Sequence, residues 1–328
     1  MAIIIELVVL TIGFVLLIKG ADWFVDGASG IAAKLGIPQL VIGLTIVAMG
    51  TSAPEAAVSI SAAFKGSADI TIGNIVGSNI MNILIILGLS AVITPLRVAK
   101  STVRYEIPFM ILMTVLLMVL GLSGEITALN GLILWGFFIL YFVYLIVLTK
   151  KQNTTGKHIC RGDAANAVKE TFAEISAEKK RVSIPKAVIL VLIGMALIVL
   201  GSNLAVDAAS DLARMFGFSE RIIGLTIVAL GTSLPELVTS VMAARKGNAD
   251  IAIGNIVGSN LFNILFVIGT SSLIIPIPFA SAFVVDFAVA TVAAVILWIF
   301  CLRENRLSRI CGGVMLATYV IYFTVWLI

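Results

Sequence analysis

Runs of about 20 apolar residues recur from one end of this chain of 328 residues to the other. A helix needs about that many apolar residues to cross the hydrocarbon core of a bilayer. Charged residues make up only 12% of the chain, about half of their share in a soluble domain. The sequence lacks the alternating strands of about 10 residues that are typical of membrane β-barrels. We therefore predict an all-α polytopic membrane protein in contact with the lipid bilayer.

Ten apolar runs predict ten transmembrane helices, five on each side of a polar segment. The first run lacks a basic n-region and a cleavage site, so we expect a span rather than a signal peptide. The predicted division is a first repeat at 1–149, a cytoplasmic linker at 150–185 and a second repeat at 186–328. Within the linker, residues 164–180 fit either an amphipathic surface helix or a solvated one. The predicted spans are 3–21, 38–64, 70–93, 104–123, 129–149, 186–206, 219–244, 251–274, 280–301 and 309–327.

The two halves carry the same motifs 181 positions apart. The first copy reads Gly-Leu-Thr-Ile-Val-Ala-Met-Gly-Thr-Ser-Ala-Pro-Glu from Gly43 to Glu55. The second copy, from Gly224 to Glu236, differs only by two leucines. The motif Gly-Asn-Ile-Val-Gly-Ser-Asn at 73–79 likewise recurs at 254–260. Because five spans is an odd number, the second copy should enter the membrane from the opposite side. We therefore expect two inverted-topology repeats, an architecture common among alternating-access transporters.

The basic residues predict the orientation of the chain in the membrane. If the N-terminus lies outside, the inside loops hold 19 of the 22 Lys and Arg residues. Only Lys65, Arg214 and Arg221 then face outward. We predict a multi-pass protein of the plasma (inner) membrane with both termini extracellular or periplasmic. The net charge of +4 lies in loops between spans and does not indicate nucleic-acid binding. The sequence carries no signal of an oligomeric state.

A proline should break the helix in each copy of the first motif. Pro54 has no N–H group, and its ring crowds the carbonyl of Gly50, four residues earlier. The carbonyls from Ala48 to Thr51 then lose helix partners. Such carbonyls are tolerated at membrane depth where they line a cavity or bind a cation.

Each copy also gathers side-chain oxygens on one helix face. Ser52, Glu55 and Ser59 share a face, with Thr51 beside them. Their counterparts in the second copy are Thr232, Ser233, Glu236 and Ser240. The following helices carry the polar stripes Asn74, Ser78 and Asn82, and Asn255, Ser259 and Asn263. The glycines at 73, 77, 254 and 258 have the spacing that allows close helix packing.

The pooled groups are hard oxygen ligands, which suit Ca²⁺, Mg²⁺ or Na⁺ rather than Zn²⁺ or Cu²⁺. Charge in hydrocarbon is costly, so an intramembrane carboxylate indicates a functional site. No Lys or Arg lies in a span core to pair with Glu55 or Glu236. Two facing glutamates repel each other unless a cation lies between them. One Ca²⁺ or two Na⁺ would neutralise both, and such mutual exclusion is a physical basis for antiport. We expect no enzymatic activity and no cofactor, because no nucleophile–histidine pair occurs.

The doubled motifs Gly-Thr-Ser-x-Pro-Glu and Gly-Asn-x-x-Gly-Ser-Asn resemble those of the cation/Ca²⁺ exchanger superfamily. The resemblance covers essentially the whole chain and is strongest to the compact prokaryotic sodium/calcium exchangers. It implies two interlocked repeats, with the second, third, seventh and eighth spans holding the ions. The first and sixth spans would form a gating pair that slides across this core.

The resemblance also implies roles for individual residues. Glu55 and Glu236 would be shared Ca²⁺ and Na⁺ ligands, and the carbonyls of Thr51 and Thr232 would complete the Ca²⁺ site. One sodium site would comprise Ser52, Ser78 and the carbonyl of Ala48, and its mirror Thr232, Ser259 and the carbonyl of Ala229. Asn82 and Asn263 would lie at the centre, where some members carry one Asp.

These residues predict Na⁺/Ca²⁺ antiport. An H⁺/Ca²⁺ exchanger is an alternative, although proton-coupled members usually carry Gly-Asn-x-x-Glu in place of Gly-Thr-Ser-x-Pro-Glu. A passive cation channel is a further alternative, because channels also contain inverted repeats with broken helices.

Overall fold

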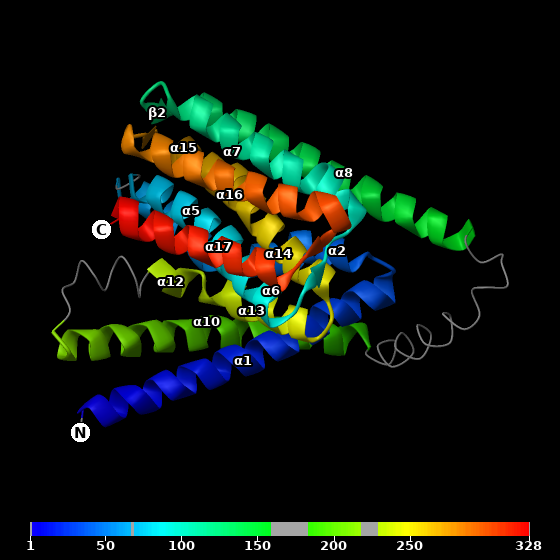
Figure 1. Ribbon diagram of the computed structural model, residues 1–328, viewed down its shortest axis with the longest axis horizontal. Coiled ribbons are helices and arrows are strands. Elements are labelled where there is room, and N and C mark those ends of the chain that lie inside the picture. Colours follow the sequence, from blue (N-terminus) through cyan, green and yellow to red (C-terminus); the bar gives the residue numbers. More distant parts are fainter. Residues whose placement is uncertain (1, 67–68, 159–182, 218–228, 328) are drawn as a thin grey trace.

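The computed structural model describes residues 2–66, 69–158, 183–217 and 229–327, and these are almost entirely helical. The helices run across the molecule in similar directions, and both chain termini lie at the same end (Figure 1). α8 and α10 meet the connecting segment at the opposite end. The expected linker helix at 164–180 lies outside the described residues, as does the start of the predicted span 219–244.

The first half consists of helices interrupted by short π-helical segments, labelled η. Its elements are α1 (Ala2–Leu35), α2 (Gln39–Ile42), η1 (Gly43–Val47), α3 (Ala48–Thr51), α4 (Ala53–Phe64), α5 (Asp69–Met81), η2 (Asn82–Leu87), α6 (Gly88–Ile93), β1 (Leu96–Arg97), η3 (Thr102–Glu106), α7 (Ile107–Gly121), β2 (Glu125–Ile126) and α8 (Ala128–His158).

The described part of the second half follows a similar order, but it lacks a counterpart of η3 and ends in an additional π-helical segment. Its elements are α10 (Ile184–Met215), α12 (Ala229–Thr232), α13 (Leu234–Arg245), α14 (Ala249–Phe262), η6 (Asn263–Ile268), α15 (Gly269–Ile274), β3 (Ile277–Pro278), α16 (Ala282–Glu304), β4 (Arg306–Leu307), α17 (Arg309–Tyr322) and η7 (Phe323–Leu327).

Among the described residues, seven helices are long and apolar enough to cross a membrane. An eighth span arises if the bent pair 39–51 and 53–64 is counted as one. These two parts meet at an angle of 50°, and the break falls at Ser52, immediately before Ala53 and Pro54. The predicted proline break is therefore confirmed in the first copy.

Three predicted helix ends are wrong, and one is that of the span expected at 129–149, which continues as α8 to His158 and so into the predicted linker. The span expected at 3–21 continues to Leu35, so that Lys19 and Lys34 lie within α1 rather than in a loop. The span expected at 186–206 continues to Met215. The apolar run ends earlier in both, but Phe24, Val25 and Ala28 remain fully buried. Packing against the rest of the protein therefore sustains the helix beyond its lipid-facing part.

α1 and α10 pack against each other in antiparallel fashion along their length. A Cβ atom built on Gly20 would lie 2.8 Å from the carbonyl oxygen of Gly194, and one built on Gly13 would lie 2.9 Å from that of Gly201. Such distances leave no room for a side chain, so glycine is required for this backbone approach. The pair lies along one side of the molecule, below the other helices in Figure 1.

α14 lies at the centre of the described helices and packs against α2, η1 and α3. A Cβ atom on Gly258 would lie 2.7 Å from the carbonyl oxygen of Leu44, and one on Gly254 would lie 2.9 Å from that of Leu40. The packing role predicted for these two glycines is confirmed. In the first copy, Gly73 meets only a phenylalanine ring at 3.7 Å, and no described atom lies within 4 Å of a Cβ on Gly77.

Four short strands join the two halves. β1 pairs with β4, and β2 pairs with β3, each as an antiparallel pair of two residues. Each pair therefore takes one strand from the first half and one from the second. The strands are the single departure from an all-helical fold among the described residues.

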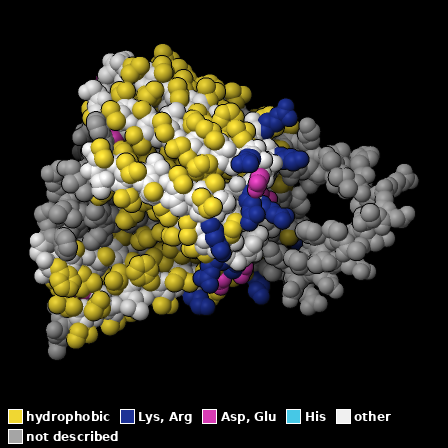
Figure 2. Space-filling model, viewed as in Figure 1, with side chains coloured by type: hydrophobic (Ala, Val, Ile, Leu, Met, Phe, Trp, Pro, Cys, Tyr) yellow, Lys and Arg dark blue, Asp and Glu magenta, His cyan; other side chains and the backbone are white. Residues whose placement is uncertain are grey.

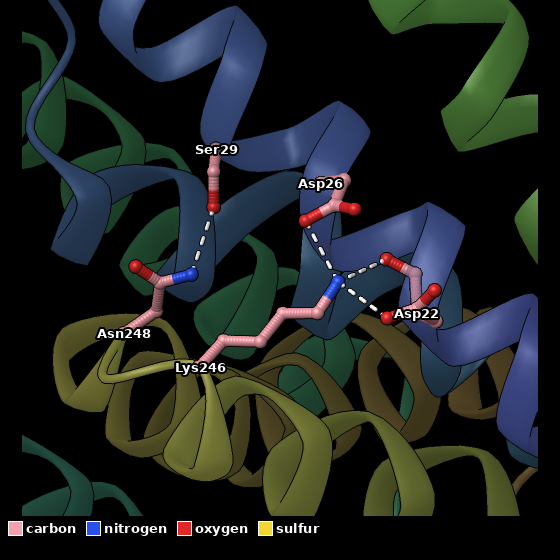
Figure 3. A network of polar contacts seen from close by, with 5 residues as sticks. All are labelled: Asp22, Asp26, Ser29, Lys246 and Asn248. Carbon is pink, nitrogen blue, oxygen red and sulfur yellow. Dashed lines mark hydrogen bonds and ion pairs between the residues drawn. The ribbon is translucent and has the colours of Figure 1, made fainter. Parts of the chain in front are cut away.

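A polar network ties α1 to the connection between α13 and α14 (Figure 3). Lys246 Nζ lies 2.6 Å from Asp22 Oδ1 and 2.7 Å from Asp26 Oδ1. It also donates to the Asp22 carbonyl over 2.8 Å. Nearby, Asn248 Nδ2 donates to Ser29 Oγ over 3.1 Å. These contacts hold the C-terminal half of α1 against the end of α13, the helix that carries Glu236.

Candidate functional site

The structure places Glu55 and Glu236 at equivalent positions in the two halves. Each lies in the first turn of the helix that follows the break, Glu55 in α4 and Glu236 in α13. Both side chains are only 1% exposed. The N-terminus of a helix carries partial positive charge, which favours a carboxylate at this position. The fold therefore buries two acidic side chains where backbone dipoles can stabilise them.

The two carboxylates are connected by crossed hydrogen bonds between the repeats. Ser52 Oγ of the first copy donates to Glu236 Oε1 over 2.7 Å. Ser233 Oγ of the second copy donates to Glu55 Oε1 over 3.3 Å. Each glutamate thus receives a hydrogen bond from the serine that precedes the other glutamate. This arrangement requires the two breaks to meet in the interior of the protein.

Two asparagines on each side form a second cluster beside the glutamates. Asn82 Nδ2 donates to Asn260 Oδ1 over 2.9 Å, and Asn263 Nδ2 donates to Asn79 Oδ1 over 3.0 Å. Asn79 and Asn260 also donate to each other's backbone carbonyls. Asn82 and Asn263 each begin a π-helical segment. Such segments are frequent at functional sites, because they redirect side chains within a helix.

A further pair of asparagines fixes the helices that carry the glutamates. Asn74 Nδ2 donates to Ser59 Oγ over 3.0 Å, and Asn255 Nδ2 donates to Ser240 Oγ over 2.9 Å. Thr51 Oγ1 donates to Asn255 Oδ1 over 3.0 Å and so joins the two halves. The side-chain amides of Asn74 and Asn255 thus donate to serines of α4 and α13, and they hold in place the helices that carry Glu55 and Glu236.

The remaining predicted residues lie around the same centre. Ser78 and Ser259 are buried, and Ser259 Oγ donates to the carbonyl of Ala48 over 3.4 Å. This carbonyl also accepts a helical hydrogen bond from the Ser52 amide over 3.0 Å, so the expected loss of its helix partner is wrong. Ala229 and Thr232 are the first and last residues of α12, and Ala229 directly follows the undescribed residues 218–228.

Four buried acceptor oxygens of this site have no hydrogen-bond partner among the described residues. They are Glu55 Oε2, Glu236 Oε2, Asn82 Oδ1 and Asn263 Oδ1. Two come from each repeat, and they occupy matching positions. Burial of a carboxylate without a partner is costly, and none of these oxygens carries a hydrogen to donate to another when the carboxylates are ionised. Buried carboxylate and amide oxygens without a hydrogen-bond partner are suited to binding a cation.

The set contains carboxylates and amides only. Among the described residues, no group of three His, Cys, Asp or Glu side chains could hold a metal ion. Oxygen ligands of this kind suit Ca²⁺, Mg²⁺ or Na⁺, whereas Zn²⁺ and Cu²⁺ are bound through imidazole and thiolate. Hydrogen bonds between the halves thus link the regions of the two carboxylates, through Ser52 and Ser233, and separately link Asn82 and Asn263 to Asn260 and Asn79.

Sequence reasoning missed two asparagines of the site. Asn79 and Asn260 were not predicted as site residues, yet their side chains orient Asn263 and Asn82. The signal was present, because both end the repeated motif Gly-Asn-Ile-Val-Gly-Ser-Asn. Their role depends on contacts between the halves, which spacing along one helix does not predict.

Known proteins share both the sequence and the fold. The family model described as sodium/calcium exchanger protein matches residues 5–147 and 186–327. The sodium/calcium exchanger MaX1 of Methanosarcina acetivorans is 33% identical over 98% of each chain. The inner membrane protein YrbG of Escherichia coli is 34% identical over 97% of this chain and 94% of its own.

A solved structure of the sodium-calcium exchanger NCX_Mj, soaked without Na⁺ and Ca²⁺, superimposes with a TM-score of 0.80. It shares 32% identity and covers 98% of this chain and 99% of its own. The match therefore extends over the polytopic helical fold as a whole, including both halves that contribute to the site. This family consists of membrane exchangers rather than enzymes. The chain belongs to the sodium/calcium exchanger family.

Proposed function

We propose that this protein exchanges Na⁺ for Ca²⁺ across the plasma (inner) membrane by alternating access. The observation that carries the proposal is the set of four unpartnered acceptor oxygens on Glu55, Glu236, Asn82 and Asn263. Two opposite repeats supply them in matching pairs. The relative MaX1 is named a sodium/calcium exchanger, which supports sodium as the coupling ion.

The charge of the site accounts for exchange. Two ionised glutamates carry two negative charges, so one Ca²⁺ neutralises them, and two Na⁺ do so equally. The same ligands would serve either cation, so the two ions would compete rather than bind together. Ser52, Ser78, Ser233 and Ser259, with Thr51, Thr232 and the carbonyls of Ala48 and Ala229, would complete the coordination. Without a bound cation, the two buried glutamate charges would be uncompensated. This cost would disfavour the alternating-access movement of the empty protein.

We propose that ten helices form two inverted repeats of five. Matching elements support this arrangement, because η2 and η6, β1 and β3, and β2 and β4 each begin 181 positions apart. The opposite insertion of the repeats is supported by the antiparallel packing of α1 on α10. The proposed domains remain 1–149, 150–185 and 186–328.

The distribution of basic side chains supports the proposed orientation. On the face drawn in Figure 2, Lys and Arg gather at the end opposite the chain termini. Hydrophobic side chains predominate on the described part of that face away from this end. Basic residues accumulate on the cytoplasmic side of membrane proteins, so the termini would be extracellular or periplasmic and residues 150–185 cytoplasmic.

Radiolabelled Ca²⁺ uptake into proteoliposomes tests the coupling. Vesicles loaded with Na⁺ should accumulate Ca²⁺ when diluted into sodium-free buffer, and equal K⁺ or pH gradients should not drive uptake. Uptake that follows the pH gradient and ignores sodium would replace the proposal with H⁺/Ca²⁺ exchange. Uptake that needs no counter-ion and exceeds transporter turnover would indicate a channel.

A further inference from the structure

A second buried carboxylate lies outside the exchange site. Glu106 ends η3 and is 1% exposed. One of its oxygens, Oε1, accepts a short hydrogen bond from the Tyr144 hydroxyl of α8. The other, Oε2, is buried and has no hydrogen-bond partner among the described residues. A buried intramembrane carboxylate with one unpartnered oxygen indicates a functional site, and the exchange mechanism makes no use of this carboxylate.

Glu106 lines a cavity of about 370 Å³ between η3, α7 and α8. The other lining residues are Arg104, Tyr105, Phe109, Phe137, Leu140, Tyr141 and Tyr144. Tyr105 is 52% and Leu140 62% exposed, so the cavity opens at the outer surface of the helices, where lipid would lie. A water molecule needs only about 10–15 Å³ of such space, so the cavity is far larger than a metal ion requires.

The free polar groups of this region match a primary ammonium group. Besides Glu106 Oε2, the buried oxygens Tyr141 Oη and Thr102 Oγ1 also have no partner among the described residues. Tyr141 lines the cavity, and Thr102 lies one turn before Glu106 in η3. A primary ammonium carries three N–H donors and one positive charge. The two oxygens that line the cavity, Glu106 Oε2 and Tyr141 Oη, offer it complementary acceptors, one of them a carboxylate.

The walls and the rim of the cavity indicate the rest of the ligand. The rings of Phe109 and Tyr141 stack with centroids 5.9 Å apart, and aromatic faces attract cations. At the rim, the Arg104 guanidinium lies 5.7 Å above the Tyr105 ring and is exposed. A guanidinium binds phosphate through paired hydrogen bonds. The cavity thus offers an anionic, aromatic interior beside a cationic rim and an apolar outer surface.

We propose that this cavity binds the headgroup of an ethanolamine phospholipid. The ammonium would enter toward Glu106, the phosphate would remain at Arg104, and the acyl chains would follow the apolar surface at Leu140. With the proposed orientation, Arg104 lies on the cytoplasmic side, so the lipid would come from the inner leaflet. The proposal concerns binding alone and holds whichever ion drives exchange.

Native mass spectrometry of the whole purified protein tests the proposal. The probes are dioleoyl phosphatidylethanolamine and, with the same chains, phosphatidylcholine and phosphatidylglycerol. Phosphatidylcholine has no N–H donor, and phosphatidylglycerol has no ammonium. We expect the ethanolamine lipid to bind the wild type at least about tenfold more tightly than either, which is the range for hydrogen bonds to charged groups. Equal binding of the three lipids would overturn the proposal.

Variants locate the site. Glu106→Gln should abolish the preference for the ethanolamine lipid, and Tyr144→Phe should weaken it while leaving the helix intact. Arg104→Gln should weaken binding of all three lipids. Asp286→Asn is the matched control, because Asp286 also accepts a tyrosine hydrogen bond, from Tyr322 over 2.9 Å, at a different place. If Glu106→Gln and Tyr144→Phe both retain the wild-type preference, the cavity is not the binding site.

Discussion

The hydroxyl of Ser52 donates to Glu236 Oε1 over 2.7 Å, although 184 positions separate the two residues. Its counterpart, from Ser233 to Glu55, is longer at 3.3 Å. The two halves of the site are therefore similar but not equal. We expect Ser52→Ala to weaken the apparent Ca²⁺ affinity about tenfold, because hydrogen bonds to charged groups contribute about 1.5–3 kcal/mol. Ser233→Ala should have a smaller effect. Calcium-dependent uptake rates measure both, and a reversed order would contradict the comparison.

Removal of either carboxyl charge should abolish exchange. Glu55→Gln and Glu236→Gln preserve the size of the side chain but leave one negative charge to bind a divalent ion. We expect uptake to fall to the level of empty liposomes, while size-exclusion profiles remain those of the wild type. Glu125→Gln, which changes an exposed glutamate in β2, is the control and should transport normally. Wild-type flux in either site variant would refute the assignment.

The central amides should contribute less than the carboxylates. Asn82→Ala and Asn263→Ala each remove one neutral oxygen ligand and one hydrogen bond to the opposite repeat. We expect partial loss, with a higher half-saturating Ca²⁺ concentration and measurable residual flux. Uptake measured over a range of Ca²⁺ concentrations would show this. If both variants behave as the wild type, these amides serve helix packing only.

An added methyl group at the contact between α1 and α10 should destabilise the protein. A Cβ atom on Gly20 would lie 2.8 Å from backbone atoms of Gly194 and Ile198, and overpacking of this kind costs about 1–3 kcal/mol. Gly20→Ala should therefore lower the melting temperature in detergent. Gly136→Ala is the control, because no atom of the described residues lies within 4 Å of a Cβ there. Equal melting temperatures for the two variants would argue against the tight pair.

Motion of α1 can be tested where Ser29 meets Asn248. The two side chains are 3.1 Å apart, beside the contact between Lys246 and Asp22 (Figure 3). We expect cysteines at both positions to form a disulfide on oxidation and to block exchange, because the proposed alternating access would require the first and sixth spans to slide. A reducing agent should restore uptake, and each single cysteine variant serves as its control. Full exchange by the cross-linked protein would show that α1 does not move at this point.

The centre of the site could be predicted from sequence because the motif is duplicated. A carboxylate that recurs 181 positions later, in spans of opposite direction, has to meet its counterpart near the middle of the membrane. That argument brought Glu55 and Glu236 together without coordinates. It also indicated Asn82 and Asn263, because they lie on the polar stripes of the neighbouring helices.

Other features depend on contacts that no single segment reveals. The end of the first apolar run indicated that the first span stops at residue 21, whereas α1 continues to Leu35 and Lys246 pairs with Asp22 and Asp26 beyond that point. Asn79 and Asn260 recur like the predicted ligands, but only the meeting of the two halves shows that they orient other amides. Glu106 has no acidic counterpart in the second half, where Phe287 lies 181 positions later. A comparison of the two repeats therefore did not identify it as a functional residue.

The short strand pairs have a mechanical consequence. β1–β4 and β2–β3 each join the two halves through backbone hydrogen bonds, and they follow helices other than α1 and α10. The two strand pairs thereby connect the helices that border them into one unit. α1 and α10 adjoin no strand and hold each other by backbone contact instead. A displacement of α1 and α10 relative to the helices that the strands join would therefore leave both described strand pairs intact.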